Sequence, residues 1–436
     1  MSKIIYIDLT DLEQWHGIHG GTQRVVYGVA KEFFSDKDSN FDVRFMSYNE
    51  KRNSFFESSF EPIIKRVEEA GRVTDDIKVA ESFEQKIKNA LSPYIPPNIK
   101  QNKQAKFLLS KILVTTKSIK HKTSILKTIS LHKQPKLIPI DFEKDDIVLV
   151  MGKPWDNIKI QDKLIEEHYK KKFKLVQLVY DLVIPFNPQL HHPSIFKQYT
   201  QNMFEAVSNS DLLLAISENT RNDILKFANL LAIQPPEIRV IRLGDNIKTK
   251  NDPQCPDTRI IQPFVASIGT IEIRKNYTEL YYAYKLGLEK GLDLPQLVII
   301  GSKGWLSDDI QYLIDNDPVL KDKLFILNNV GDNSLAWVYK NCSFAIYPSM
   351  YEGWGLPVAE ILANGKFCIA SHSSSIPEIA GDLIEYFSPY DTNQCLSLIL
   401  KYYNNTSLLR KKETDIIQKY KITSWHDTYK AISSVI

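Results

Sequence analysis

Short apolar runs alternate with amphipathic stretches along most of this chain of 436 residues. In the first half, the apolar runs are 4–8, 41–47, 146–151, 174–181, 210–217 and 239–244, and in the second half they are 264–269, 297–301, 324–327, 342–348 and 367–370. Continuous apolar runs of this length are typical of parallel strands that are covered on both faces. Strands alternating with helices predict an α/β protein with a parallel sheet in each half.

The length of the chain predicts two domains of ordinary size, because one hydrophobic core rarely serves so many residues. Residues 246–262 are polar, contain proline and show no periodicity, which suits a linker between domains. We therefore expect an N-terminal domain at 1–245, a C-terminal domain at 263–417 and a last helical segment at 418–436.

Residues 349–365 carry the most informative local pattern of the chain. Gly353 and Gly355 predict a tight turn, and Pro357 suits the first residue of a helix that Gly365 would end. A glycine-rich turn that opens a helix presents free backbone N–H groups to an anion such as phosphate. Glu352 and Glu360 frame this turn with seven residues between them. The alternative interpretation is a glycine-rich surface loop with two solvated glutamates.

This stretch and the apolar run before it resemble the Glu-x7-Glu signature of retaining family 4 glycosyltransferases. The resemblance implies that Glu352 contacts the transferred sugar and that Glu360 binds the ribose of the nucleotide. It also implies that the loop after Glu352 holds sugar and phosphate through Gly353, Trp354, Gly355 and Leu356. Trp354 stands where phenylalanine is more usual in the family.

The resemblance implies the GT-B fold, in which two Rossmann-like domains face each other across a cleft that holds the active site. The helix in residues 418–436 would then cross back to the N-terminal domain. Residues near 50–140 fit the family pattern poorly, which indicates an insertion or a diverged region in the N-terminal domain.

A second glycine-rich turn, Gly20 and Gly21, precedes a helical pattern that begins near Val25. Taken alone, the two glycines could only shape a turn. Beside the Glu-x7-Glu stretch they resemble the N-domain loop that reaches the donor diphosphate in this family. Arg24 would face the donor or the acceptor, and we assign it to the acceptor side.

The apolar run at 174–181 ends in Tyr180 and Asp181, at the end of a strand where open α/β sheets place their ligands. This segment resembles the family's His-Asp-Leu-Ile-Pro, with Tyr180 in place of histidine. We expect Asp181 to act in the active site, although an aspartate there can simply cap a loop. We assign Tyr180 and His191 to the acceptor side. His191 has no third ligand at a suitable spacing, so no metal site is predicted.

Arg274 and Lys275 follow the run at 264–269 and match the basic pair of the family's Gly-Thr-x-Glu-x-Arg-Lys-Asn variant. Two fixed cations at the end of a strand can neutralise a diphosphate, although they could also form a solvated surface pair. Thr270 stands where many members carry arginine, and we assign it to donor binding together with Gly331. The predicted catalytic residues are therefore Glu352, Asp181, Arg274 and Lys275.

Charge is distributed unevenly along the chain. Residues 98–137 contain ten lysines and no Asp, Glu or Arg, so a chain with a net charge of +3 carries about −7 elsewhere. Apolar residues of this segment share a helical stripe that lysines flank, which suits the surface of an anionic membrane. A helix packed on the core with a solvated lysine face fits equally well. Nucleic acid is a weaker third alternative, because aromatic residues hardly interleave the lysines.

Four cysteines without Cys-x-x-Cys spacing, no apolar run long enough to span a bilayer and no signal peptide together suggest a cytoplasmic protein. Peripheral attachment to the inner face of the plasma membrane is the variant that the lysines suggest. No cofactor and no metal are expected.

The resemblance implies a retaining, metal-independent hexosyltransferase of bacterial surface polysaccharide assembly. Its donor would be a nucleoside-diphosphate sugar, with GDP-mannose as the first choice. Its acceptor would be a glycan or lipid-linked glycan. The alternatives are a rhamnosyl or other hexosyl transferase that uses a dTDP- or UDP-sugar, and a catalytically silent GT-B subunit docked at a membrane. A sugar phosphorylase and a nucleotide-sugar epimerase are further rivals of similar architecture.

Overall fold

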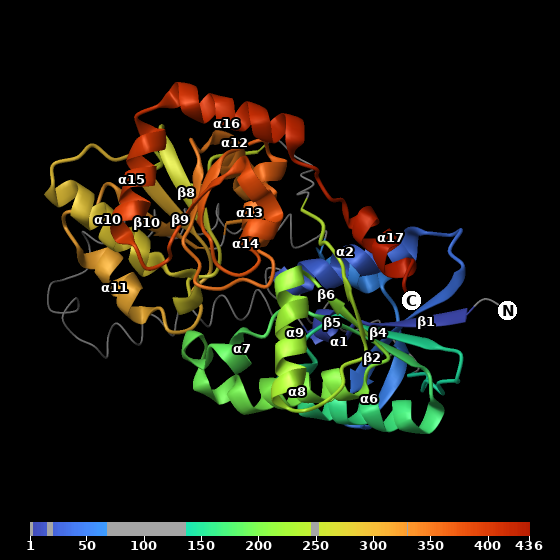
Figure 1. Ribbon diagram of the computed structural model, residues 1–436. Helices are drawn as coiled ribbons and strands as arrows, with labels where there is room; N and C mark the ends of the chain where they lie inside the picture. The colour runs from blue at the N-terminus through green and yellow to red at the C-terminus, as the bar shows by residue number, and fades with distance from the viewer. Residues whose placement is uncertain (1–2, 15–20, 68–136, 246–252, 329) are drawn as a thin grey trace, which may run out of the picture. The chain divides into compact units, whose positions relative to one another are not determined.

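The computed structural model describes residues 3–14, 21–67, 137–245, 253–328 and 330–436 (Figure 1). The chain divides into two compact units, one made of Met1–Ile63 with Ile140–Ile436 and the other of Ile64–Pro139. Gly20, residues 98–136 of the lysine-rich segment and residues 246–252 of the predicted linker lie outside the described residues. All that follows concerns the first unit.

The N-terminal half of this unit contains a seven-stranded sheet with the order β3-β2-β1-β4-β5-β6-β7. Its strands are β1 (Lys3–Asp8), β2 (Phe41–Asn49), β3 (Ser54–Ser58), β4 (Ile147–Val150), β5 (Lys174–Val179), β6 (Leu212–Ala215) and β7 (Glu237–Val240). Neighbouring strands are parallel except for β3, which pairs antiparallel with β2. Strand β3 was not predicted and falls in the range 50–140, so the start of that range belongs to the sheet.

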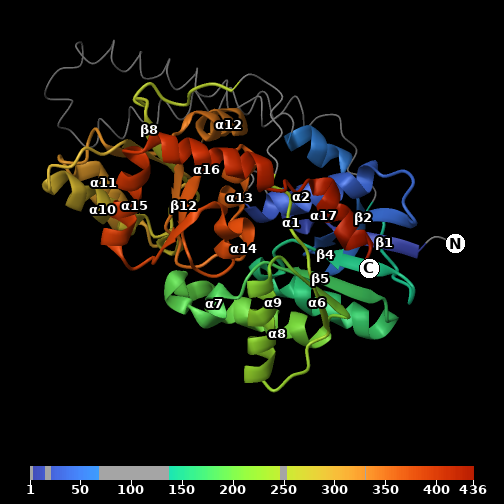
Figure 2. The ribbon, with the colours of Figure 1, turned by 45° about the horizontal axis from the view of Figure 1, so that its top comes forward.

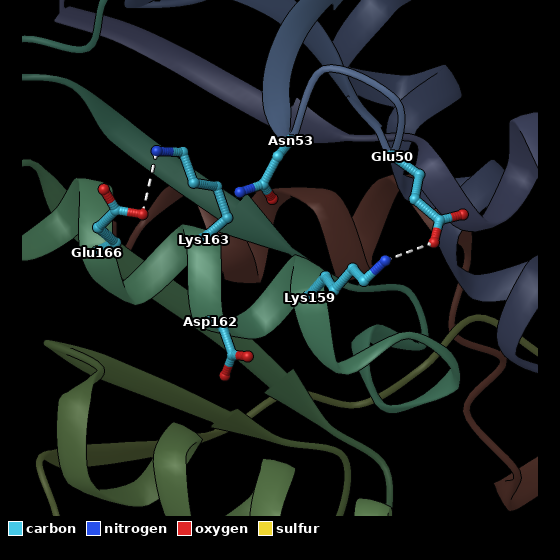
Figure 3. Close-up of a pocket in the computed structure, with 6 residues that line it drawn as sticks. All are labelled: Glu50, Asn53, Lys159, Asp162, Lys163 and Glu166. Atoms are coloured by element: carbon cyan, nitrogen blue, oxygen red, sulfur yellow. Dashed lines mark hydrogen bonds and ion pairs between the residues drawn. The ribbon is translucent and has the colours of Figure 1, made fainter.

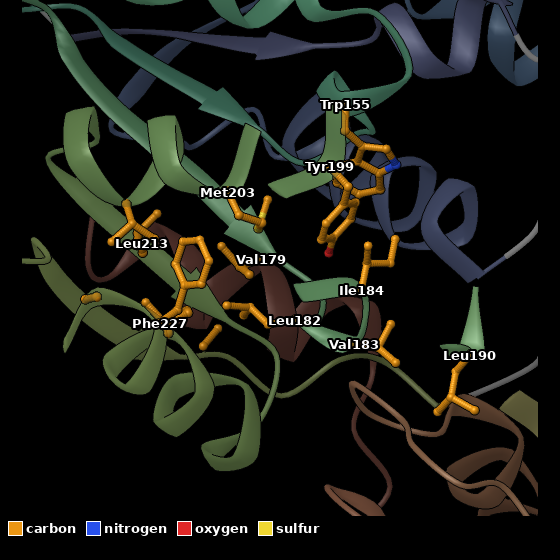
Figure 4. Packing of buried hydrophobic residues seen from close by; sticks show 14 residues of the cluster. Trp155, Val179, Leu182, Val183, Ile184, Leu190, Tyr199, Met203, Leu213 and Phe227 are labelled. Atoms are coloured by element: carbon orange, nitrogen blue, oxygen red, sulfur yellow. The ribbon is translucent and has the colours of Figure 1, made fainter. Parts of the chain in front are cut away.

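The helices of this half are α1 (Thr10–Gln14), α2 (Gly21–Ser35), α6 (Ile158–Lys171), α7 (Val183–Phe186), α8 (Phe196–Asn209) and α9 (Glu218–Leu230). Helix α9 begins at Glu218, because the side chain of Ser217 accepts a hydrogen bond from the N–H of Thr220. Buried residues of β5, α7, α8 and α9 form one apolar cluster that includes Val179, Met203 and Phe227 (Figure 4). This packing fixes the segment after β5, which carries Asp181.

The C-terminal half contains a six-stranded sheet with the order β10-β9-β8-β11-β12-β13, and all its neighbouring strands are parallel. Its strands are β8 (Phe264–Ile268), β9 (Gln296–Ile300), β10 (Leu324–Leu327), β11 (Ala345–Tyr347), β12 (Cys368–Ser371) and β13 (Glu385–Phe387). Its helices are α10 (Tyr277–Glu289), α11 (Asp308–Asn316), α12 (Asp332–Asn341), α13 (Leu356–Ala363), α14 (Ile376–Ala380), α15 (Thr392–Tyr403) and α16 (Thr406–Lys419).

The order of strands in the second sheet reverses between β8 and β11, which are neighbours in space although two strands separate them in sequence. Open α/β sheets bind their ligands at the carboxyl ends of the strands beside such a switch point. The loop after β8 carries Arg274 and Lys275, and the loop after β11 carries Glu352. The topology therefore brings both predicted parts of the active site to the same place.

The last helix, α17 (Trp425–Ser433), begins with a capping box formed by Ser424 and Asp427. It packs on α2 of the N-terminal half (Figures 1 and 2), as the resemblance implied. A Cβ atom added to Gly28 would lie 2.5 Å from the Trp425 ring, and one added to Gly244 would lie 2.6 Å from it. Both positions therefore need glycine for the indole to approach the backbone.

Candidate active site

Two of the three glycines around α13 have the conformation that the sequence predicted. Gly355 caps the helix with φ of 106°, and Gly365 follows it with φ of 71°. Pro357 is the second helical residue, because the helix already begins at Leu356. Gly353 corrects the prediction: it is outside the left-handed region, but an added Cβ would lie 2.1 Å from the carbonyl oxygen of Tyr180. Glycine is needed there for close approach.

Glu352 lies buried between two cations. Its Oε2 is 2.7 Å from Nη1 of Arg274, and its Oε1 is 2.5 Å from Nζ of Lys275. Burial by itself would raise the pKa of Glu352, but the two cations outweigh it and lower the pKa to about 2. The N–H of Glu352 also donates to Oγ of Ser374 at 2.7 Å. The carboxylate is therefore ionised and fixed at neutral pH.

Arg274 is held by a second carboxylate that the site prediction did not include. Its Nη2 donates to Oε1 of Glu272 at 2.6 Å, and its Nη1 also donates to the carbonyl of Tyr351 at 2.7 Å. The side chain of Glu272 is only 1% exposed. Burial raises the pKa of Glu272, and the neighbouring Arg274 and Lys275 oppose that rise. The signal was available, because Glu272 is the glutamate of the Gly-Thr-x-Glu-x-Arg-Lys-Asn pattern.

Asp181 lies close to this cluster from the other half of the chain. A Cβ atom added to Gly353 would be 3.1 Å from Cβ of Asp181. Oδ1 of Asp181 accepts a hydrogen bond from the N–H of Val183 at 3.1 Å, so the aspartate also caps its loop. Burial raises the pKa of Asp181, while Arg274 pulls it down. The buried carboxyl groups of Glu352 and Glu272 and the half-buried one of Asp181 thus lie around Arg274.

Glu360 has both carboxylate oxygens occupied. Oε1 is 2.8 Å from Nη1 of Arg24, and Oε2 accepts a hydrogen bond from the Tyr339 hydroxyl at 2.6 Å. Nη2 of Arg24 lies 2.7 Å from Asp332. Burial raises the pKa of Glu360, and Arg24 and Tyr339 limit the rise. Arg24, which we assigned to the acceptor side, therefore contacts the carboxylate that we assigned to the donor.

Two predicted site residues have side chains that bind within the protein. The Tyr180 hydroxyl donates to the carbonyl of Met151 at 2.6 Å. Trp354 is 6% exposed, and the guanidinium of Arg242 lies over its ring at 5.6 Å. Both side chains thus support the loops that carry the charged residues.

The remaining predicted residues that the structure describes lie on four separate segments. A Cβ atom added to Gly21 would lie 3.7 Å from Cδ1 of Leu356, so the start of α2 reaches the start of α13. Gly331 precedes α12 as its N-cap. The methyl group of Thr270 lies against Gly304, at 2.7 Å from the position of an added Cβ. The ring of His191 contacts that of Trp305, a residue that the sequence did not single out.

The described residues contain no group of three or more His, Cys, Asp or Glu side chains placed to hold a metal ion. Among the helices described, none is both long and apolar enough to cross a bilayer.

A pocket of about 390 Å³ lies away from these residues (Figure 3). It is lined by Glu50, Asn53, Lys159, Asp162, Lys163 and Glu166. Its lysines are paired, Lys159 with Glu50 at 3.0 Å and Lys163 with Glu166 at 3.1 Å. None of the predicted site residues lines this pocket.

The second half of the chain matches a known family. Residues 256–421 match the family described as Glycosyl transferases group 1. These residues form a glycosyl transferases group 1 domain. The group 1 domain includes Arg274, Lys275, Glu352 and Glu360, so the ion-paired cluster around Glu352 belongs to it.

Curated relatives match part of the chain and are distant in sequence. The O-antigen chain mannosyltransferase B of Escherichia coli is 26% identical over 259 residues, which cover 58% of this chain and 68% of that protein. The serotype-specific mannosyltransferase WbdA of Escherichia coli is 23% identical over 269 residues, which cover 59% of this chain but only 32% of WbdA.

Solved structures resemble the chain over its full length. The crystal structure of TarM superposes with a TM-score of 0.59 and 14% identity, covering 100% of this chain and 98% of TarM. Sucrose-phosphate synthase from Thermosynechococcus elongatus gives a TM-score of 0.58 with 15% identity, covering 99% and 98% of the two chains. The fold is GT-B, as predicted.

Proposed function

We propose that this glycosyltransferase moves a hexose with retention of configuration from a nucleoside-diphosphate sugar to a glycan or lipid-linked glycan. The observation that carries the proposal is the buried Glu352 carboxylate in contact with Arg274 and Lys275, at the switch point of the second sheet. A bacterial surface polysaccharide is the product that the relatives' names favour.

Each charged group has one role in the proposed reaction. Arg274 and Lys275 stabilise the negative charge that grows on the departing diphosphate, and fixed cations in a buried site do this with little reorganisation. Glu352 holds the transferred sugar, and Glu360 accepts hydrogen bonds from the ribose. The chain's own cations supply the charge stabilisation, so the proposed reaction uses no metal.

Mannose from GDP-mannose is the first choice of donor. Its support is the pattern around Arg274 together with the relatives that are named mannosyltransferases. A UDP-sugar fits the same charged groups equally well, since they contact phosphate and ribose rather than the base. A dTDP-sugar offers the same diphosphate to Arg274 and Lys275, but its deoxyribose gives Glu360 only the 3′-hydroxyl.

The test is release of nucleoside diphosphate from a panel of GDP-, UDP- and dTDP-sugars, with oligosaccharide and lipid-linked acceptors present. We expect release from one donor and a loss of about 100-fold or more in Glu352→Gln, the size seen when a group that stabilises a transition state is removed. Glu50→Gln, in the separate pocket, is the matched control and should keep full activity. Equal rates in Glu352→Gln and wild type would refute the role of Glu352.

The second candidate is a catalytically silent subunit that docks at a membrane, which the ten lysines of residues 98–137 favour. It predicts no release from any donor, even with lipid-linked acceptors present. Four ion-paired residues argue against a silent subunit, because a scaffold has no chemical need for them. They are Glu352, Glu360, Arg274 and Lys275.

A further inference from the structure

The loop after β9 is fixed against the loop that carries Arg274. The N–H of Ile271 donates to the carbonyl of Ser302 at 2.8 Å, and the N–H of Gly304 donates to the carbonyl of Ile271 at 2.8 Å. A Cβ atom added to Gly304 would lie 2.7 Å from the Thr270 methyl group. The position of the next residue, Trp305, is therefore set by close backbone contact with the loop that carries Arg274.

Trp305 meets the other half of the chain at His191. Its Nε1 donates to the carbonyl of Leu190 at 3.2 Å, and the two rings lie 4.2 Å apart between centroids at 35°. Neither residue is fully buried, and Leu306 beside them is 48% exposed. An aromatic pair therefore borders solvent at the carboxyl end of β9.

His191 offers a hydrogen-bond donor at the same place. Its Nδ1 accepts from the N–H of His192 at 2.9 Å, so the proton of the neutral ring sits on Nε2. Burial, with a further contribution from nearby Arg274, lowers the pKa of His191 and keeps the ring neutral. None of the described residues accepts a hydrogen bond from this Nε2. The N–H is thus available to a ligand.

We propose that Trp305 and His191 form a subsite for one pyranose ring of the acceptor. A pyranose has an apolar C–H face, which suits the negative face of an aromatic ring, and a rim of hydroxyl groups, one of which would accept from Nε2 of His191. The inference rests on the proposed function. That function assigns the ribose to Glu360 and the diphosphate to Arg274, which leaves the His191 side of Arg274 for the acceptor.

The binding test is saturation-transfer NMR with the methyl glycosides of mannose, glucose, galactose, rhamnose and N-acetylglucosamine, each with the wild-type protein. We expect saturation of at least one glycoside, its loss in Trp305→Ala and its retention in Trp305→Phe. His191→Phe should weaken it, because the ring remains but the N–H donor is gone. No saturation of any glycoside by the wild type, or equal saturation by Trp305→Ala, would overturn the subsite.

Two further readouts separate this inference from a folding defect and from the proposed function. Nucleoside diphosphate should still raise the Tm of Trp305→Ala, which shows that the donor side is intact. If it does not raise the Tm, Trp305→Ala has a folding defect, and the NMR results for Trp305→Phe and His191→Phe then test the subsite. In the transfer assay, the acceptor KM of Trp305→Ala should rise about tenfold, as expected for one aromatic contact. Should the wild type release no nucleotide, the proposed function fails, while the NMR result still tests the sugar subsite.

Discussion

Glu352 stays ionised although it is buried, because two cations contact it. Removing one partner of such a cluster leaves an unpaired buried charge, which costs far more than the net contribution of the pair. Glu272 extends the cluster, since it pairs with Nη2 of Arg274 while Glu352 pairs with Nη1. The pKa of Glu360 is raised rather than lowered, because Arg24 is the single cation among the described residues that pairs with this buried carboxylate.

We predict that Arg24→Ala makes nucleotide binding more sensitive to acid. In the proposed function Glu360 accepts hydrogen bonds from the ribose hydroxyls, for which it must be ionised, and Arg24 opposes the rise in its pKa. Without Arg24 the pKa of Glu360 rises further, so affinity for nucleoside diphosphate should be lost at a higher pH than in the wild type. Calorimetric titrations from pH 5 to 8 measure this midpoint.

Arg24→Lys keeps the positive charge and is the matched variant for this titration. Its midpoint should stay near that of the wild type. If Arg24→Ala binds nucleotide more tightly at all pH values, Arg24 competes with the ribose for Glu360, and its supporting role is refuted.

At the scale of single elements, the last helix packs so close to the backbone of the N-terminal half that only glycine fits at two contact positions. Helix α17 presents Trp425 to two backbone segments of the N-terminal half, at Gly28 in α2 and at Gly244 after β7. Its Tyr429 ring also packs edge-on against Phe33, at 4.6 Å between centroids. The last helix is therefore held by shape as well as by apolar contact.

Gly28→Ala should destabilise the protein by about 1–3 kcal/mol, the usual cost of overpacking a close contact. Trp425→Ala removes the ring that clashes, so adding Gly28→Ala to it should have almost no further effect. Scanning fluorimetry of the wild type, both single variants and the double variant measures the coupling. Additive losses in Tm would show that Gly28 does not contact Trp425 in solution.

At the scale of the whole molecule, charge is segregated along the chain. Residues 98–137 carry ten lysines, while the rest of the chain is about −7. An acidic body with a basic segment favours orientation at an anionic surface, because each lysine near such a surface contributes about 1 kcal/mol. The alternative is a helix that packs on the core with its lysines in solvent.

We predict binding of the full chain to vesicles that contain anionic phospholipid, and none to vesicles of neutral lipid. A variant with Lys111, Lys117 and Lys120 changed to glutamine should bind more weakly, and added salt should weaken the wild type in the same way. Co-sedimentation measures both. Equal binding to neutral vesicles, or no change in the variant, would favour the packed helix.

The sequence by itself determined the alternation of strands and helices, the glycine turn before α13 and the charged residues Arg274, Lys275 and Glu352 of the loops after β8 and β11. These features are periodic or local, so apolar runs and the conformational limits of glycine and proline report them directly. Strands β3 and β13 escaped prediction because they are short edge strands that are only partly buried.

Only the tertiary structure decided which distant residues meet. Arg24 and Glu360 are 336 positions apart, and no local pattern reports their ion pair. No local pattern reports the reason for Gly353 either. A side chain is excluded there by the carbonyl oxygen of Tyr180 and not by the dihedral angles of Gly353. The strand order places the Arg274 and Glu352 loops together at the switch point, and burial there sets their charge states, since desolvation and ion pairing depend on neighbours in space.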